Sequence, residues 1–496
     1  MSGPRSLVLV TVDCLRADHV GFLGYARPTT PFLDSLAPTS AVFRNAVVAG
    51  APTYYSFPAI LASRYPLALG RDLVGLAPSE DTLASALNES GFQTAAFVAA
   101  NPYLSQRFGY DQRFHVFNDF LSGSTKEANL AGVEQFGKSR GSRANQFLRD
   151  VSHVWGPSGA AYDELYFQYC QAVSGRENET LDSLRKFPSA DVVVEHAIAW
   201  LDKNAGVPFF LWLHLMDPHS PYYPKPQALE EMGDRSISAR DARYLNSYWA
   251  RGDLSAARLQ KKRDRIVALY DAGIRWVDTQ VRRLAERLVE MNAWDRCMLA
   301  VTADHGEEFL EHGGRFHSPV KLTEELVRVP LLLRAPSAEQ GIFDQPLSLI
   351  DLAPTLLEGL NVAVPASFRG QSLWRHLSGS KRWNELVLTE CVYGCTNPFR
   401  AEDRAGPRIL AVRSGDFKLV VNFSAGTEQF FNLTSDPLEQ SPLPHDAELG
   451  VRRRLLECAR EHVAESHQSR DFNHRLCSQL REHRLEWAHS PATTTN

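Results

Sequence analysis

The sequence predicts an α/β protein: a mostly parallel sheet flanked by helices, followed by a smaller C-terminal α+β domain. Apolar runs rich in β-branched residues, such as residues 7–12, recur along the chain, as expected of strands buried on both faces of a parallel sheet. Helical patterns lie between these runs, and strands that alternate with helices are typical of a doubly wound sheet. After about residue 377 the apolar runs become shorter and lose the intervening helices.

The elements of the large sheet can be assigned in chain order. The residues between 122 and 189 are weakly periodic and rich in Gly, Ser and Arg, which predicts an insertion or lid with a helix at Ala160–Ala172. The predicted strands are Leu7–Val12, Thr94–Ala99, Pro208–His214 and Met298–Thr302, and the predicted helices are Thr82–Ser90, Asp191–Asn204 and Ala256–Met291.

The C-terminal part has a different pattern, so we divide the chain into a unit of residues 1–376 and a smaller unit of residues 377–496. Four short runs predict an antiparallel sheet, and a helix is expected around Glu448–Ser466, before a charged helix and a frayed tail. The four predicted strands are Glu385–Glu390, Arg408–Val412, Phe417–Asn422 and Gln429–Asn432.

Composition excludes several classes of partner. The 496 residues are 44% hydrophobic and 22% charged, with a net charge of -5, so no nucleic-acid partner and no anionic membrane surface are expected. No apolar run approaches the roughly 20 residues that span a bilayer, and no signal peptide is expected. The cysteines, 7 in number, are scattered and sparse, which favours a reducing compartment and a cytoplasmic location. The sequence does not indicate an oligomeric state.

Acids and histidines follow three of the predicted strands. Asp13 follows the first, His214 and His219 lie at and after the third, and Asp304 and His305 follow the fourth. In open parallel sheets, ligands bind beyond the carboxyl ends of the strands, so we expect these side chains to converge. An adjacent carboxylate and imidazole can reach one cation. The alternative for an isolated Asp-His pair is a helix-capping Asp beside a surface His.

The segment of residues 51–66 is expected to be a loop that runs into a helix, with Pro58 in the first helical turn. Hydroxyls just ahead of a helix N-terminus face the positive end of the helix dipole, which is an anion site. Thr53 and Ser56 are the candidates. Ser56 could instead cap the helix, an explanation that suits Thr53 less well. Asn101 follows a strand and could donate to an anionic oxygen, or it could form a turn before the next proline.

Seven ordered segments together resemble the sulfatase family of the alkaline phosphatase superfamily. Each is weak alone, but the ordered set spans almost the whole chain apart from residues 122–189. The resemblance implies an alkaline-phosphatase-like fold and a metal-dependent ester hydrolase whose metal is held by Asp13, Thr53, Asp304 and His305. The segments are 11–19 (TVDCLRADH), 214–222 (HLMDPHSPY), 270–278 (YDAGIRWVD), 302–307 (TADHGE), 324–330 (EELVRVP), 348–357 (SLIDLAPTLL) and 431–437 (FNLTSDP).

The chain departs from the family pattern at the nucleophile. Formylglycine sulfatases open the motif Cys-x-Pro-Ser-Arg with Cys or Ser, whereas this chain has Thr53 there, with Tyr55 and Phe57 in place of Pro and Arg. Threonine is not converted to formylglycine. Cys14 replaces the usual second Asp, and His305 replaces the usual Asn. The resemblance therefore implies a threonine-nucleophile branch, similar to phosphodiesterases, phosphonate hydrolases and lipid phosphotransferases.

The implied cofactor is one divalent metal ion. The imidazole of His305 suits Zn²⁺ or Mn²⁺ better than Ca²⁺, which prefers hard oxygen ligands. Cys14 could touch the metal, or it could be a buried structural thiol. A second metal held by Asp217, His219 and His317 is an alternative, because paired metals clamp the attacking and leaving oxygens. The spacing of Asp217 and His219 does not match two-zinc relatives well, so we favour one metal.

The predicted reaction is attack by the metal-activated Thr53 hydroxyl, formation of a covalent threonine ester and its hydrolysis. His219 and His317 are predicted to serve the leaving oxygen. Together with Asn101 and His214 they are predicted to contact the substrate, although His214 could instead be a packed histidine. The expected substrate is a small-molecule or saccharide- or lipid-derived phosphate or phosphonate ester, a diester before a monoester. The alternatives are sulfate-ester hydrolysis without formylglycine, transfer of a phospho-head-group, and an inactive binding protein.

Overall fold

The computed structural model describes residues 5–70, 73–121, 163–169, 171, 179–317, 321–336, 338, 340–377, 383 and 385–466. The predicted helix at 160–172 falls partly outside these ranges, as does most of the predicted insertion and the tail. Within the described ranges, no helix is both long and apolar enough to cross a membrane.

The described residues form a large sheet with the strand order β10-β2-β9-β6-β1-β5-β3-β4, and β11 pairs with β2. The pairs are parallel except those of β9, which runs antiparallel to β2 and β6. This confirms the predicted mostly parallel sheet. The strands are β1 (Ser6–Val12), β2 (Ala41–Val47), β3 (Gln93–Val98), β4 (Val116–Asn118), β5 (Phe209–Leu215), β6 (Cys297–Ala303), β9 (Arg328–Arg334), β10 (Gly341–Phe343) and β11 (Leu347–Ser348).

The three central strands β1, β5 and β6 are buried along their whole length. Their continuous apolar sequences satisfy the need for packing on both faces of the sheet. In the register of the sheet, Val12 at the end of β1 lies opposite Leu215 of β5 and Ala303 of β6. The carboxyl ends of the three strands are therefore level, and the residues that follow them leave the sheet at one edge.

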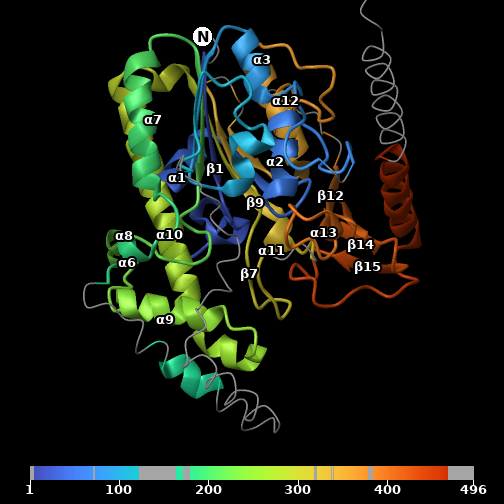
Figure 1. Cartoon of the computed structure of the whole chain (residues 1–496). Helices are drawn as coiled ribbons and strands as arrows, with labels where there is room; N and C mark the ends of the chain where they lie inside the picture. The colour runs from blue at the N-terminus through green and yellow to red at the C-terminus, as the bar shows by residue number, and fades with distance from the viewer. Residues whose placement is uncertain are drawn as a thin grey trace, which may run out of the picture.

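Helices cover both faces of this sheet (Figure 1). One layer contains α7 (Ala190–Asn204) and the long α10 (Ala256–Glu290), and the other contains α2 (Thr53–Ala62), α3 (Leu83–Glu89) and α12 (Leu352–Gly359). The remaining short elements are α1 (Pro31–Leu36), α6 (Leu181–Leu184), α8 (Pro226–Glu231), α9 (Ala239–Trp249), α11 (Glu324–Val327), α13 (Ala401–Arg404), β7 (Glu308–Phe309) and β8 (Arg315–Phe316).

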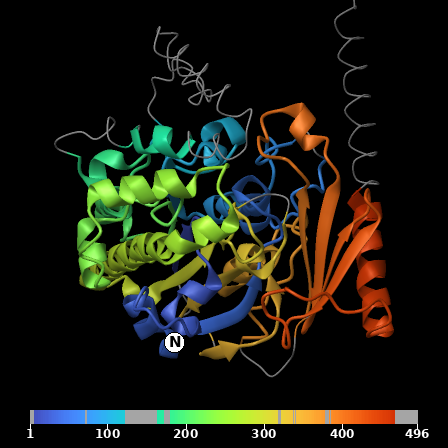
Figure 2. The ribbon, with the colours of Figure 1, turned by 90° about the horizontal axis from the view of Figure 1, so that it is seen from below.

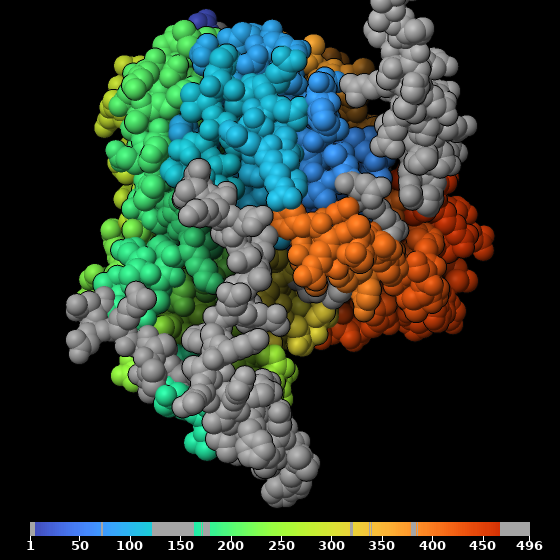
Figure 3. All heavy atoms as spheres, viewed as in Figure 1, coloured from blue at the N-terminus to red at the C-terminus, as the bar shows by residue number. Residues whose placement is uncertain are grey.

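The C-terminal unit is an antiparallel meander in the order β12-β13-β14-β15. A helix over residues 449–466 packs on it through Leu455 and Ala459 and lies on its outer side (Figure 2). In the space-filling view this unit, coloured orange to red, lies directly against the larger one (Figure 3). The strands are β12 (Leu386–Val392), β13 (Arg408–Ser414), β14 (Phe417–Asn422) and β15 (Thr427–Asn432). The division at 376/377 stays a prediction.

Helix α2 begins earlier than the sequence analysis placed it. Thr53 is its first residue, and Ser56 and Pro58 lie inside it, so the alternative of Ser56 as the N-cap is wrong. The first turn is closed before Pro58, because the N–H groups of Tyr55 and Ser56 donate to the carbonyl of Pro52 at 2.8 and 3.1 Å. Pro58 therefore lies inside α2 and does not mark its start.

Candidate active site

Asp13 and Asp304 leave the sheet at the ends of β1 and β6 and are completely buried. One oxygen of Asp304, Oδ1, accepts the backbone N–H groups of Cys14 at 3.3 Å and of His305 at 3.0 Å. The other oxygen, Oδ2, accepts no hydrogen bond from the described residues. Burial and the neighbouring Asp13 raise the pKa of Asp304 to about 7. A buried carboxylate oxygen without a partner is costly in a folded protein and indicates a missing ligand.

His305 is held with one ring nitrogen aimed at this carboxylate pair. Its Nδ1 lies 2.8 Å from the carbonyl oxygen of Gly306, which fixes the proton on Nδ1 and leaves Nε2 as an acceptor. Nε2 lies 3.5 Å from Asp304 Oδ2 and 3.8 Å from Asp13 Oδ1. Burial and the nearby His317 lower the pKa of His305 to about 4. The imidazole is therefore neutral, which is the form that binds metals.

Thr53 faces the same point from the first turn of α2. Its hydroxyl Oγ1 lies 3.1 Å from His305 Nε2, and Thr53 as a whole is 5% exposed. The predicted ligand set, Asp13, Thr53, Asp304 and His305, is thus brought together in space. Two carboxylates, a hydroxyl and a neutral imidazole suit a borderline divalent cation, and the unpartnered Asp304 Oδ2 gives that cation a place. These residues fit the metal that the resemblance implies.

Asn101 and His214 lie beside Asp13 and are almost fully buried. The Asn101 amide Nδ2 donates to Asp13 Oδ2 at 3.0 Å, and its Oδ1 accepts the N–H of Tyr103. His214 lies with Nδ1 3.0 Å from the Thr11 hydroxyl and Nε2 3.3 Å from Asp13 Oδ2. Both side chains therefore orient Asp13. For His214 this favours the packed-histidine alternative, and substrate contact by either residue stays a prediction.

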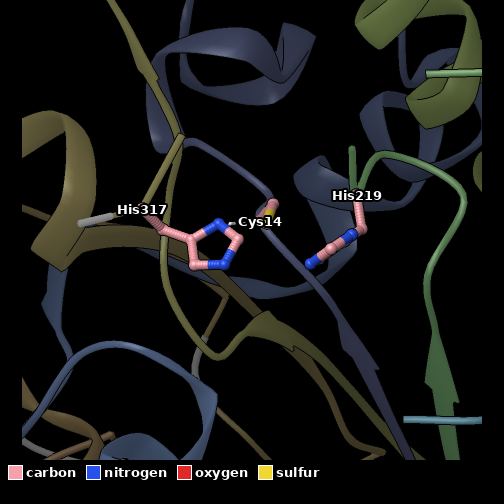
Figure 4. A group of neighbouring side chains, drawn as sticks. All are labelled: Cys14, His219 and His317. Carbon is pink, nitrogen blue, oxygen red and sulfur yellow. Dashed lines mark hydrogen bonds between the residues drawn. The ribbon is translucent and has the colours of Figure 1, made fainter. Parts of the chain in front are cut away.

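A second cluster lies next to these residues. The rings of His219 and His317 are 5.1 Å apart, and those of His305 and His317 are 4.6 Å apart. The thiol of Cys14 lies 3.5 Å from His317 Nδ1. Figure 4 shows the three side chains of Cys14, His219 and His317 converging from different segments. Burial lowers the pKa of His317, but Glu307, Asp13 and Asp304 outweigh it and raise that pKa to about 9.

Asp217 does not belong to this cluster, which argues against the alternative second-metal set of Asp217, His219 and His317. Its Oδ1 lies 3.0 Å from Nη1 of Arg185, and its Oδ2 accepts the N–H of Ala190 at 2.9 Å. The carboxylate is thus neutralised by an arginine and holds the start of α7. The sequence could not indicate this because Arg185 lies 32 residues away.

Glu307 lies at the site but is not among the predicted site residues. This residue is completely buried, and its carboxylate interacts with the Tyr222 hydroxyl and the His317 imidazole. Its Oε2 lies 3.6 Å from His317 Nδ1. The only available signal was its position two residues after His305 in the 302–307 segment, where it reads as an ordinary surface acid.

Comparison with known proteins agrees with this geometry. The family model described as Sulfatase matches residues 5–362. The chain belongs to the sulfatase family. A second family model, N-sulphoglucosamine sulphohydrolase, C-terminal, matches residues 311–461 of this sulfatase-family protein. Family membership places the chain in the alkaline phosphatase superfamily of hydrolases.

Relatives of this sulfatase-family chain carry several names. The multifunctional alkaline phosphatase superfamily protein PehA of Trinickia caryophylli is 24% identical over 89% of this chain and 91% of its own. The arylsulfatase of Clostridium perfringens is 24% identical over 90% and 92%. The phosphonate monoester hydrolase of Silicibacter pomeroyi has a TM-score of 0.64 at 18% identity, with 94% of this chain and 95% of its own covered. At that identity the solved structure shows the fold alone.

Proposed function

We propose that this protein hydrolyses phosphate or phosphonate esters, diesters before monoesters, with Thr53 as the nucleophile. The observation that carries the proposal is the position of the Thr53 hydroxyl, 3.1 Å from His305 Nε2, at the carboxylate pair of Asp13 and Asp304. A threonine hydroxyl stands where formylglycine sulfatases carry the modified residue. Threonine cannot form formylglycine, so we infer direct attack by its alkoxide.

The residues around Thr53 support each part of this reaction. His305 Nε2 lies 3.1 Å from the Thr53 hydroxyl, so a cation bound by His305 would also reach that hydroxyl. The N-terminal end of α2 favours negative charge on the substrate. A divalent cation, Zn²⁺ or Mn²⁺ in preference to Ca²⁺, would supply Lewis acidity that lowers the pKa of the hydroxyl and stabilises the phosphoryl oxygens. Asn101 and His214 hold Asp13 in place.

We place the leaving oxygen of the substrate next to His219 and His317. His317 has a raised pKa of about 9, so its imidazole carries a positive charge near neutral pH. A positive charge there stabilises the departing oxygen or protonates it. Attack by Thr53 breaks the bond to the leaving oxygen and forms a threonine ester, and water then cleaves this ester to regenerate the hydroxyl.

Sulfate-ester hydrolysis is the second candidate, because the relatives include proteins named arylsulfatase and choline-sulfatase. The two candidates differ in the charge of the reacting centre. A phosphate monoester carries two negative charges near neutral pH, whereas a sulfate ester and a phosphodiester each carry one. A site that selects by charge alone would therefore accept both the diester and the sulfate ester.

A panel of p-nitrophenyl esters separates the candidates. The full chain is freed of metal with a chelator, reloaded with Zn²⁺, Mn²⁺ or Ca²⁺, and assayed on the sulfate, the phosphate, a phosphodiester and a phosphonate. We expect the highest kcat/KM on the phosphodiester or phosphonate with Zn²⁺ or Mn²⁺. The proposal fails if p-nitrophenyl sulfate is the best substrate, or if only Ca²⁺ restores turnover.

The cytoplasmic location is a further part of the proposal. It is supported by the sparse and scattered cysteines of the chain, a pattern typical of a reducing compartment. Fractionation of the source cells tests it, and recovery of the protein in the extracellular or periplasmic fraction would contradict it.

A further inference from the structure

We propose that Tyr270 is a positioning residue for the metal site, because its hydroxyl fixes the turn after β1 and so keeps Asp13 and Asp304 aimed at one point. Tyr270 lies near the middle of the 35-residue helix α10 and is completely buried. Its hydroxyl forms hydrogen bonds to backbone groups of the turn rather than to either carboxylate. The inference rests on the metal site of the proposed function and names a residue that holds this site in shape.

The chain turns sharply at Cys14, directly after Asp13. The φ angle of Cys14 is 60°, in the left-handed region that is unfavourable for a residue with a side chain. Such a conformation persists only where the surrounding contacts hold it. The contacts of this turn therefore decide where the carboxylate of Asp13 points.

Both backbone groups of Cys14 are engaged. Its N–H donates to Oδ1 of Asp304 at 3.3 Å, and its carbonyl oxygen accepts the hydroxyl hydrogen of Tyr270 at 2.7 Å. The same hydroxyl accepts the N–H of Arg16 at 2.9 Å. One phenolic oxygen thus closes the turn from both sides. The residue that it holds by the carbonyl is also the residue whose N–H orients the second carboxylate.

The Tyr270 ring is packed on several sides. The rings of His19, Tyr222 and Phe309 lie edge-on to it, with centroids 5.2, 6.0 and 5.0 Å away. The next residue of α10, Asp271, lies 2.8 Å from His19 Nδ1, so the helix also holds the chain beyond the turn. Groups on rigid elements hold a ligand set more precisely than groups on loops do, and α10 is therefore suited to this role.

Arg16 connects the same turn to the end of β6. Its Nη1 donates to the carbonyl oxygen of Glu307 at 2.9 Å, in the segment that follows Asp304. The turns after β1 and β6 are thus tied to each other. Loss of the Tyr270 hydroxyl should loosen both carboxylates, although no atom of either is changed.

Tyr270→Phe tests the proposal, because it removes one oxygen atom and leaves the ring in place. The dissociation constant for Zn²⁺ should rise about 10–100-fold, as is typical when a group that orients metal ligands is changed. Competition between the full chain and a chelator of known affinity measures this constant with no substrate present. At saturating Zn²⁺, kcat on the best p-nitrophenyl ester should fall while KM is unchanged, because the hydroxyl touches no substrate.

Thr94→Val is the matched control, because Thr94 closes a similar turn at the opposite end of the sheet. Its Oγ1 donates to the carbonyl oxygen of Arg113 at 2.9 Å and accepts the N–H of His115 at 3.1 Å. Arg113 has a φ angle of 65°, and Thr94 is completely buried in β3. Both variants should have a lower Tm than wild type, but Thr94→Val should bind Zn²⁺ as wild type does. An equal loss of affinity in the two variants would reflect a weakened fold and overturn the proposal.

A rescue experiment identifies the hydrogen bond as the cause. Replacing Tyr270 with para-aminophenylalanine keeps a hydrogen-bond donor at the same point and should restore part of the affinity that Tyr270→Phe loses. A chain that binds Zn²⁺ no better than Tyr270→Phe would contradict this cause. If wild type and Tyr270→Phe bind Zn²⁺ equally well, the role of Tyr270 alone is lost. A wild-type chain that binds no metal would instead overturn the metal site of the proposed function, and this inference with it.

Discussion

Two buried clusters of charge in this protein differ in how their charges are balanced. At the junction of the two units, Glu324 Oε1 lies 3.0 Å from Lys418 Nζ, and its Oε2 lies 3.0 Å from Arg413 Nη1. Lys418 also lies 2.9 Å from Glu439 Oε1. Two acids thus face two bases, all of them less than a tenth exposed. At the candidate active site, the ion-pair partners of the buried acids among the described residues are imidazoles: His214 and His305 for Asp13, His305 for Asp304 and His317 for Glu307.

The difference separates a structural cluster from a functional one. Charges that are paired within the chain hold α11 against β13 and β14, and they need nothing from outside. A buried acid such as Asp304, which lies beside the neutral His305, lowers the stability of the metal-free protein, and it is retained where a ligand compensates it. Removing a charge should therefore lower the stability of the fold at the junction and raise the stability of the metal-free fold at the active site.

The largest effect is expected on turnover at the active site. Thr53→Ala removes the nucleophile, so kcat on the best p-nitrophenyl ester should fall by about 10⁴-fold. Thr53→Ser retains a hydroxyl and should keep a measurable fraction of the activity. Far-UV circular dichroism should be unchanged in both variants. Full turnover by Thr53→Ala would remove Thr53 from the mechanism.

At the junction, Lys418→Met should destabilise the fold strongly. The change preserves most of the side-chain volume but leaves Glu324 and Glu439 short of a cation, which costs about 3–5 kcal/mol in buried pairs. Urea unfolding followed by circular dichroism measures it. The control is Arg44→Met, because Arg44 is 52% exposed in its pair with Asp344 and should change stability by less than about 1 kcal/mol. Equal effects of the two changes would contradict the comparison.

The sequence predicted the sheet and its active edge because both depend on local patterns. Continuous apolar runs marked β1, β5 and β6. Asp13 and Asp304, which follow β1 and β6, had to meet because these strands are parallel neighbours. The predicted start of α2 was wrong, because hydrogen bonds to the Pro52 carbonyl close the first turn well before Pro58.

Other parts of the site depend on contacts between distant segments. Asp217 was considered as a ligand of an alternative second metal, because nothing near it in the sequence indicates that Arg185 pairs with it. Glu307 was missed because only its burial distinguishes it from a surface acid. The strand β9 enters the sheet antiparallel between β2 and β6, an order that periodicity alone does not specify.

The pH dependence of stability tests the junction more finely. Burial raises the pKa of Glu324, but Lys418 and Arg413 outweigh it and lower that pKa to about 2. Because the pKa of Glu324 in the fold lies below its ordinary value of 4.5, the ionised carboxylate stabilises the fold at pH values above 4.5. This stabilisation is lost as the pH falls toward 2. Between about pH 6 and pH 3, wild type should lose about 1–2 kcal/mol more than Glu324→Gln. Glu286→Gln is the control, because Glu286 is exposed. The stability of this variant should change with pH as that of wild type does. A Glu324→Gln profile parallel to that of wild type would contradict the paired state.

The smallest effect has the opposite sign and belongs to the active site. Asp304 has a pKa raised to about 7, so its charged form destabilises the fold increasingly as the pH rises above the ordinary value of 3.8 and through 7. In Asp304→Asn the amide oxygen can still accept the backbone N–H groups of Cys14 and His305, as Asp304 Oδ1 does in the wild type. The new amide N–H takes the place of Asp304 Oδ2, which lies 3.5 Å from His305 Nε2 in the wild type. The chelated variant should therefore gain about 1–2 kcal/mol at about pH 8.

Zinc should reverse this order, because a bound ion stabilises only the protein that retains the site. Thermal melts of wild type and Asp304→Asn, each with chelator and with Zn²⁺, measure both changes together. The added ion should raise the Tm of wild type more than that of the variant. A chelated Asp304→Asn that is less stable than chelated wild type would mean that Asp304 is already compensated within the chain, and the contrast with the junction would then fail.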